Sequence, residues 1–119
     1  MTDLLLVGLG GVAGAVARHL TATAVERDQW DTLTVNVLGS FLLGALVAVP
    51  ADESLLLAAG TGFCGAFTTF SSFAVDTVRL AETGRPRRAA LNAAGTLAAA
   101  LIAVALGGAV GVALGSVAP

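Results

Sequence analysis

The chain has 119 residues, of which 56% are hydrophobic and 12% are charged, with a formal net charge of −2 and a mean hydropathy of +0.90. This composition excludes a disordered chain, and it argues against an ordinary soluble domain because one small core cannot bury so much apolar surface. The chain has no lysine and a slight excess of acids, so its charge gives no support for nucleic-acid binding.

Charged residues are confined to short stretches between long apolar ones. No Asp, Glu, Lys or Arg occurs in residues 32–51, 54–75 or 89–119, and residues 4–24 contain only Arg18 and His19 as basic side chains. Each stretch is long enough for a helix of roughly 20 residues, which crosses a hydrocarbon core of about 30 Å. The sequence therefore predicts one membrane domain over residues 1–119, with four transmembrane helices at about residues 4–24, 33–50, 54–78 and 88–115.

The first predicted helix is expected to be a membrane span and not a secretory signal. Asp3 precedes its apolar run, where a signal would have basic residues, and three further spans follow. Gly10 and Gly14 are four residues apart, a spacing that lets membrane helices approach closely. The same spacing recurs later, at Ser40, Gly44, Gly107, Gly111 and Gly115. We interpret these small residues as packing faces.

The arginines are distributed unevenly between the predicted loops. Arg27 lies in the first loop and Arg18 in the adjoining half of the first helix. The other four lie in or beside the third loop, at Arg79, Arg85, Arg87 and Arg88, and the second loop has none. With four spans, the first and third loops share one side of the membrane. The positive-inside rule therefore predicts that these loops are cytoplasmic and that both termini are extracellular.

Few polar residues interrupt the predicted spans, and nearly all are uncharged. Serine and threonine can bond to carbonyls of their own helix, so each alone is better explained structurally. The amide of Asn36 needs partners in a bilayer, and a structural and a functional role are about equally supported. No Glu lies inside a span, and Asp76 is a borderline acid near the end of the third. Hydrogen-bond donors without an embedded carboxylate suit an anion, whereas a proton-coupled exporter needs a titratable acid.

The third predicted helix contains the unusual stretch GFCGAFTTFSSF, residues 62–73. Its glycines and the β-branched pair at residues 68–69 weaken a helix and predict a break. Backbone carbonyls freed by a break would form an oxygen-lined cation site. Beyond it, Phe70 and Phe73 share a helical face, and the edges of their rings are partially positive. Packing is the commoner role of phenylalanines at this spacing, and solvation of an anion is the alternative.

The same stretch resembles the third-helix signature of the Fluc (CrcB) fluoride channel family, Gly-x-x-Gly-x-x-Thr-Thr-Phe-Ser-Thr-Phe. GGVAGAVARH (residues 10–19) resembles that family's Gly-Gly-x-x-Gly-Ala-x-x-Arg-Tyr opening, and TLTVNVLGSFLLG (residues 32–44) resembles its Val-Asn-x-x-Gly-Ser-Phe run. The resemblance implies an all-α membrane protein with four transmembrane helices, assembled as an antiparallel, dual-topology dimer. It also implies a passive, fluoride-selective channel, not an enzyme, that exports cytoplasmic fluoride through the plasma membrane.

The resemblance implies roles for individual residues, from their positions in these motifs and, for two residues of the fourth helix, without a sharp motif. Phe70 and Phe73 would line the pore with their ring edges, and Asn36 would be an amide donor to fluoride. The backbone carbonyls of Gly65 and Thr68 would hold a structural sodium ion, which is not transported, at the centre of the dimer. The other residues implied in the fluoride pathway are Thr69, Ser71, Asn92 and Thr96.

Some positions depart from the family pattern. His19 replaces the Tyr that commonly follows the arginine of the first motif. That arginine is Arg18 here, and it would anchor helix packing or an anion vestibule. Asp76 replaces a common Glu and shares the ring face, but it could pair with Arg79, so we expect it at the pore mouth or in a structural role. Homodimeric members insert in both orientations, yet the arginines here are strongly biased. We therefore expect an oppositely oriented paralogue as partner, with a homodimer as the other possibility.

Two other functions stand as hypotheses beside the channel. A proton-coupled small multidrug exporter has about this size and four spans, but Arg18 lies where such a protein would need an embedded Glu. A non-conducting membrane scaffold would make Phe70 and Asn36 functionally dispensable.

Overall fold

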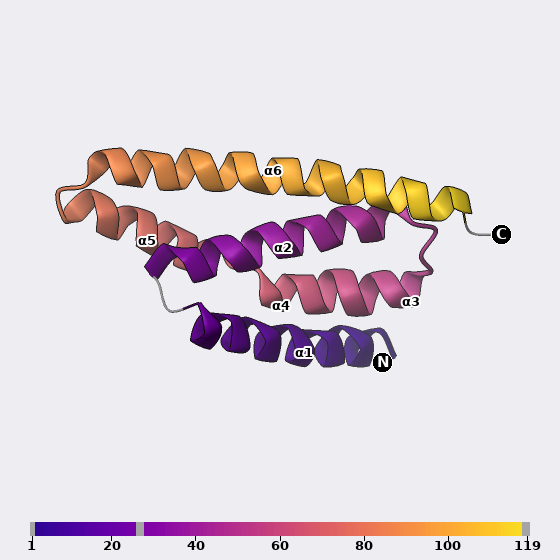
Figure 1. Ribbon diagram of the computed structural model, residues 1–119. Coiled ribbons are helices and arrows are strands. Elements are labelled where there is room, and N and C mark those ends of the chain that lie inside the picture. The colour runs from indigo at the N-terminus through magenta and orange to yellow at the C-terminus, as the bar shows by residue number, and fades with distance from the viewer. Residues whose placement is uncertain (1, 26–27, 118–119) are drawn as a thin grey trace.

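The computed structural model describes residues 2–25 and 28–117, so Arg27 lies outside the described residues. In chain order the elements are α1 (Thr2–Ala24), α2 (Asp28–Ala48), α3 (Glu53–Leu55), η1 (Leu56–Cys64), α4 (Gly65–Phe67), α5 (Phe70–Glu82) and α6 (Pro86–Val117) (Figure 1). Among the described residues, four spans are long and apolar enough to cross a membrane: Thr2–Ala24, Trp30–Ala48, Glu53–Glu82 and Pro86–Val117. The prediction of an all-helical chain with four such spans is confirmed.

The last two spans are longer than the approximate bounds predicted for them. The third continues to Glu82 instead of residue 78, and the fourth runs from Pro86 to Val117 instead of from 88 to 115. Arginine and glutamate are good helix formers, so a helix does not stop where its apolar run stops. Proline is favourable in the first turn of a helix, which accounts for the start of α6 at Pro86.

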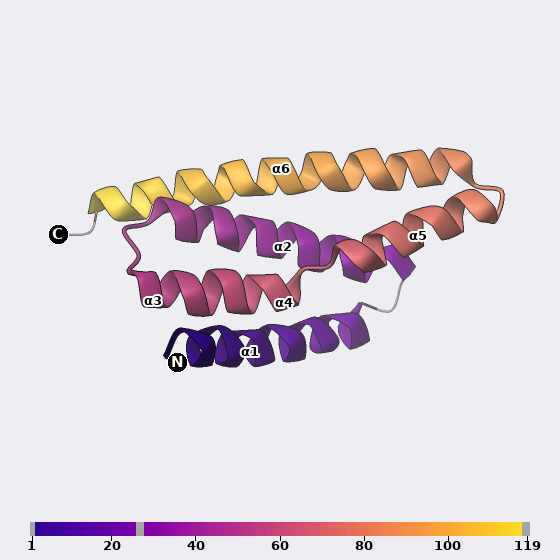
Figure 2. The same cartoon turned by 180° about the vertical axis from the view of Figure 1, so that it is seen from behind.

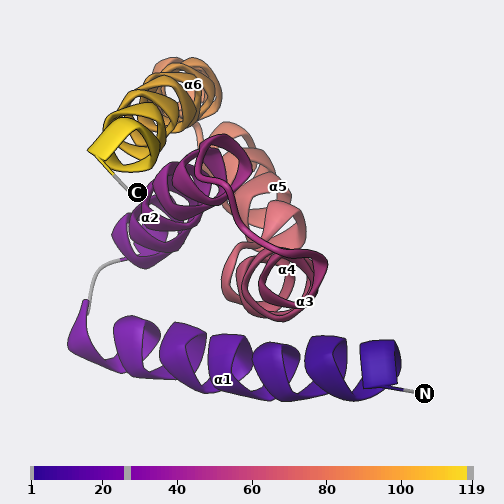
Figure 3. The same cartoon turned by 90° about the vertical axis from the view of Figure 1, so that its right-hand side faces the viewer.

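The four spans lie together in a body with extents of 54 × 31 × 22 Å. Helix α1 begins and α6 ends at the same end of this body, which also contains the α2–α3 connection (Figure 1). The turn between α5 and α6 lies at the opposite end. Figure 3 views α2 and α6 nearly along their axes and shows α1 lying obliquely across the other helices. The arginines at positions 79, 85, 87 and 88 are therefore gathered at one end.

Glycines bring the backbones of the first and third spans into direct contact. A Cβ atom on Gly10 would collide with the carbonyl of Ala58, and one on Gly14 would collide with the backbone of Phe63. On the other side of the contact, Gly62 faces the backbone of α1 in the same way. The interpretation of Gly10 and Gly14 as a packing face is confirmed.

Glycines also bring the backbones of the second and fourth spans into direct contact. A Cβ on Gly44 would meet the backbone of Val104, and one on Gly107 would meet the carbonyl of Phe41. Gly111 faces the next turn of α2 at similarly short range. Helices α2 and α6 form the most extensive contact between two elements of the described chain.

The third span changes its conformation and its neighbours along its length (Figure 2). Segment η1 is a π-helix that contains Gly60 and Gly62, and α4 ends at Phe67. Thr68 and Thr69 have extended backbones, with φ and ψ of −85° and 162° and of −151° and 123°. The part before them packs mainly on α1 through η1 and α4, whereas α5, after them, packs mainly on α6.

Candidate functional site

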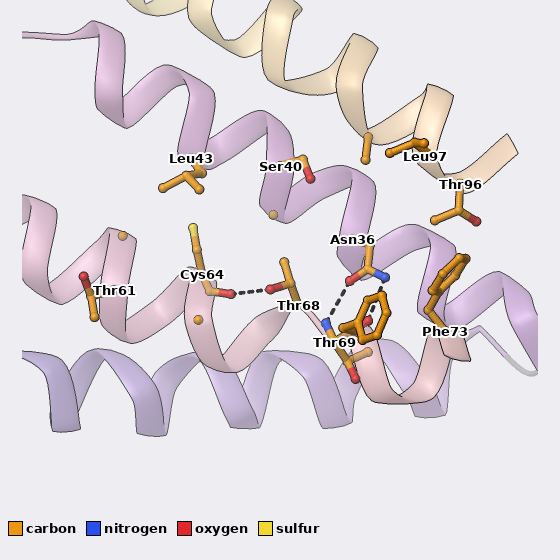
Figure 4. A pocket seen from close by; sticks show the side chains of 15 residues that line it. Asn36, Ser40, Leu43, Thr61, Cys64, Thr68, Thr69, Phe73, Thr96 and Leu97 are labelled. Atoms are coloured by element: carbon orange, nitrogen blue, oxygen red, sulfur yellow. Dashed lines mark hydrogen bonds between the residues drawn. The ribbon is translucent and has the colours of Figure 1, made fainter. Parts of the chain in front are cut away.

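A groove of about 450 Å³ lies between α2, the third span and α6, beside the two extended residues (Figure 4). Its lining includes the side chains or backbones of seven residues that the sequence suggested for the fluoride pathway or the sodium site: Asn36, Gly65, Thr68, Thr69, Phe70, Phe73 and Thr96. Ser40 and Thr61 add two further hydroxyl groups. None of its lining residues, all within the described chain, is charged. The groove therefore offers amide, hydroxyl and aromatic groups to a ligand.

The amide of Asn36 is paired with the backbone of Thr69 (Figure 4). Its Nδ2 donates to the Thr69 carbonyl at 2.9 Å, and its Oδ1 accepts from the Thr69 N–H at 2.8 Å. An amide nitrogen has two N–H groups, so one remains that can donate to a ligand in the groove. Asn36 thus has a structural task that does not use up its capacity as a donor.

Two backbone N–H groups at the extended residues donate to side chains instead of to the carbonyl one helical turn earlier. In an uninterrupted helix the Thr69 N–H would bond to the Gly65 carbonyl, and the Ser72 N–H would bond to the Thr68 carbonyl. Here the Thr69 N–H donates to Asn36 at 2.8 Å, and the Ser72 N–H donates to Oγ1 of Thr69 at 3.2 Å. The Thr68 hydroxyl donates back to the Cys64 carbonyl at 2.8 Å. The carbonyls of Gly65 and Thr68 therefore lose their usual helical donors.

Phe70 and Phe73 both lie on the groove, one turn apart on α5. Their ring centroids are 5.8 Å apart and the ring planes are inclined by 49°. Phe70 is 78% exposed, whereas Phe73 is half-buried. The ring of Phe70 is therefore open at the groove, whereas that of Phe73 is partly covered.

Two residues of the predicted pathway lie outside the groove lining. Asn92, on α6, donates to the hydroxyl of Thr77 at 2.9 Å, and that hydroxyl donates to the Phe73 carbonyl at 2.8 Å. The Ser71 hydroxyl is exposed and lies 3.2 Å from Oγ1 of Thr69. Asn92 is therefore connected to Phe73 by hydrogen bonds through Thr77, and its side chain does not line the groove.

Arg18 lies at the other side of the interrupted segment. Its Nη2 donates to the hydroxyl of Ser72 at 3.2 Å, and both side chains are half-buried. They line a small cavity of about 90 Å³ between α1, α2 and α5, to which Asp31 and Thr69 also contribute. Asp76 is half-buried on α5 and does not line this cavity or the groove.

The sequence profile of the family described as "CrcB-like protein, Camphor Resistance (CrcB)" matches residues 5–108. The chain belongs to the CrcB family. It is 57% identical over 110 residues to "Fluoride-specific ion channel FluC 2" of Natronomonas pharaonis, covering 92% of this chain and 95% of the relative. A protein of the same name from Haloarcula marismortui is 53% identical over 105 residues, covering 85% and 87%. Natronomonas pharaonis also has a "FluC 1", 47% identical over 107 residues, covering 83% and 85%.

The resemblance to the CrcB family is thus confirmed, but one contact of the site had no signal in the sequence and a second had only a partial one. Ser72 lies 54 residues from Arg18, and no spacing rule pairs them. Thr77 had a partial signal, because it follows Phe73 by four residues and can bond back to that carbonyl. Its acceptance of a hydrogen bond from Asn92 depends on how α5 and α6 fold together.

Proposed function

We propose that this CrcB-family chain forms a passive, fluoride-selective channel that exports cytoplasmic fluoride. The observation that carries the proposal is the groove, where an amide, several hydroxyls and the rings of Phe70 and Phe73 meet without a charged side chain. Relatives that are 57% and 53% identical are named fluoride-specific ion channels. The chain is proposed to act as a channel and not as an enzyme.

The chemistry of the groove suits a small, strongly hydrated anion. A pore for fluoride must replace water with donors and partial positive charge at close range. The second N–H of Asn36, the Thr69 and Thr96 hydroxyls and the ring edges provide this without a full cation, which would hold the ion too tightly. The Arg18 guanidinium near Ser72 would attract anions to the mouth, and Asp76 would act structurally or at that mouth.

The functional unit is proposed to be an antiparallel dimer. The exposed ring of Phe70 and the open side of the groove would be covered by a second subunit. In the proposed orientation in the plasma membrane both termini are extracellular and the arginine-rich end is cytoplasmic. Because a strong bias favours one orientation, the partner would be an oppositely oriented paralogue. The occurrence of FluC 1 and FluC 2 in one organism supports a pair of this kind, and a homodimer is the alternative.

A structural sodium ion at the dimer centre fits the residues at the interruption. The carbonyls of Gly65 and Thr68 border the groove and have lost the N–H donors they would have in a continuous helix. Carbonyl oxygens are the hard ligands that such a cation prefers. One pair from each subunit would supply the site, and the ion would hold the subunits together without being transported.

The experiment is fluoride efflux from liposomes, measured with an electrode, for the chain alone and together with a paralogue. We expect efflux down a fluoride gradient without a proton gradient, a large preference over chloride, and a loss of flux when sodium is withdrawn. Equal passage of chloride would refute fluoride selectivity. Proton-driven movement of cationic dyes would instead support an exporter, and full flux by the chain alone in both orientations would refute the paralogue requirement.

A further inference from the structure

The turn between α5 and α6 concentrates positive charge at one end of the molecule. Four arginines lie within residues 79–88, all with exposed side chains: Arg79, Arg85, Arg87 and Arg88. The same ten residues contain one acid, Glu82, so their net charge is 4 − 1 = +3. We call these four arginines the basic edge.

Three of these charges surround the start of a helix, where cations are unfavourable. Helix α6 begins at Pro86, has no acidic residue in its first turn, and carries Arg87 and Arg88 there. The start of a helix has a partial positive charge, which repels guanidinium groups. By contrast, α3 begins with an Asp52 carboxylate that accepts from the Leu55 N–H at 2.8 Å. An anion bound at the basic edge would remove the repulsion.

An apolar groove adjoins the basic edge. It has a volume of about 400 Å³ and is lined by Ala74, Val75, Val78, Arg79 and Glu82 on the outer face of α5. Val75 and Val78 are each 53% exposed. The groove is therefore apolar toward the middle of the span and charged toward its end.

The basic edge lies at the depth of lipid headgroups. Helix α6 has 32 residues, and at a rise of 1.5 Å per residue it is roughly 48 Å long. The hydrocarbon core measures about 30 Å and the bilayer with its headgroups about 40–45 Å. If α6 is centred across the bilayer, its first turns lie in the polar layer and the neighbouring valines of α5 lie at its border with the acyl chains.

We propose that the basic edge and this groove bind an anionic phospholipid. The phosphate lies among the guanidinium groups, which can bond to two of its oxygens at once, and an acyl chain runs along Val75 and Val78. Juxtamembrane clusters of basic residues attract anionic lipids electrostatically. The apolar half of the site selects a lipid over free phosphate. This inference does not rest on ion conduction.

The test is native mass spectrometry of the full-length protein in detergent with equimolar dioleoyl phosphatidylglycerol and dioleoyl phosphatidylcholine. We expect phosphatidylglycerol adducts to dominate. The triple variant R85Q/R87Q/R88Q should lower the ratio of the two adducts by about tenfold or more. Val78→Ser should reduce lipid adducts severalfold. The control Asp52→Asn, at the opposite end, should leave the ratio unchanged.

Several outcomes would overturn the proposal. One is equal binding of the two lipids to the unaltered protein, and another is an unchanged adduct ratio in the triple variant. A third is that millimolar inorganic phosphate displaces the lipid while Val78→Ser has no effect on lipid binding. If the triple variant does not fold, the single variant Arg87→Gln serves, with a severalfold decrease expected and no decrease contradicting the site. Because lipid adducts are counted directly, a failure here leaves the fluoride experiment unaffected.

Discussion

The side-chain amide of Asn36 forms hydrogen bonds with both backbone groups of Thr69, 2.9 Å to its carbonyl and 2.8 Å from its N–H. In a bilayer no water replaces the helical bonds that an extended residue loses, so each unpaired group is costly. Asn36 supplies the donor and the acceptor that a neighbouring strand would supply. One side chain thus stabilises the extended backbone and also places an amide in the groove.

We predict that Asn36→Ala weakens both stability and fluoride flux. The change leaves the Thr69 N–H and carbonyl without their partners, which should lower the free energy of unfolding by about 2–4 kcal/mol. Thermal unfolding in detergent and fluoride efflux measure the two effects. Thr34→Ala is the matched control, since its hydroxyl bonds only to the Trp30 carbonyl of the same helix. Unchanged stability in Asn36→Ala would show that the pair does not support the extended segment.

We predict that Phe70→Ile separates function from stability. The ring is 78% exposed in the chain, so its loss should change the free energy of unfolding by less than about 1 kcal/mol. Fluoride efflux should fall at least about tenfold because the ring edge is replaced by an aliphatic group. Phe41→Ile, on α2 and outside the groove lining, is the control and should keep its flux. Retention of full efflux in Phe70→Ile would exclude this ring from the pathway.

We predict that Gly10→Ala destabilises the protein by about 1–3 kcal/mol. The added methyl group would overlap the Ala58 carbonyl, a backbone atom that cannot move without shifting the third span. Gly8→Ala is the control, because a Cβ there meets nothing within 4 Å. The unfolding temperatures of the two variants decide the matter, and equal values would contradict the backbone contact.

We predict an energetic coupling between Arg18 and Ser72. The two side chains are joined by a hydrogen bond of 3.2 Å, so Arg18→Gln and Ser72→Ala should not have additive effects on unfolding. The coupling in a double-mutant cycle should be about 1 kcal/mol. The pair Arg18 and Ser116 gives the reference, since the Ser116 hydroxyl bonds within α6, and its coupling should be near zero. Strict additivity for Arg18 and Ser72 would refute the contact.

The sequence was sufficient to predict the four spans and to name most of the polar and aromatic residues that line the groove. Hydropathy locates the spans, because each must be apolar over the thickness of a bilayer. The residues of the motif around Phe70 and Phe73 are close along the chain, so they also lie close together at the groove. The pairing of Asn36 with Thr69 could not be predicted, because the two residues are 33 positions apart and meet only through packing of α2 on the third span. The hydrogen bond from Asn92 to Thr77 could not be predicted either, because it depends on how α5 and α6 fold together, while the pathway role that the resemblance implies for Asn92 stays a prediction.

The glycine contact between the first and third spans also restricts how the protein can change over evolutionary time. Where two main chains touch, there is no side chain to exchange for a larger or smaller one, so a substitution at Gly10 or Gly62 cannot be compensated by a neighbour. Accommodation would require moving all of α1, and Arg18, about two turns further along, would move away from Ser72 with it. Exposed residues of α1 can be exchanged without this constraint. The backbone contact at Gly10 and Gly62, by contrast, fixes the distance between Arg18 and Ser72.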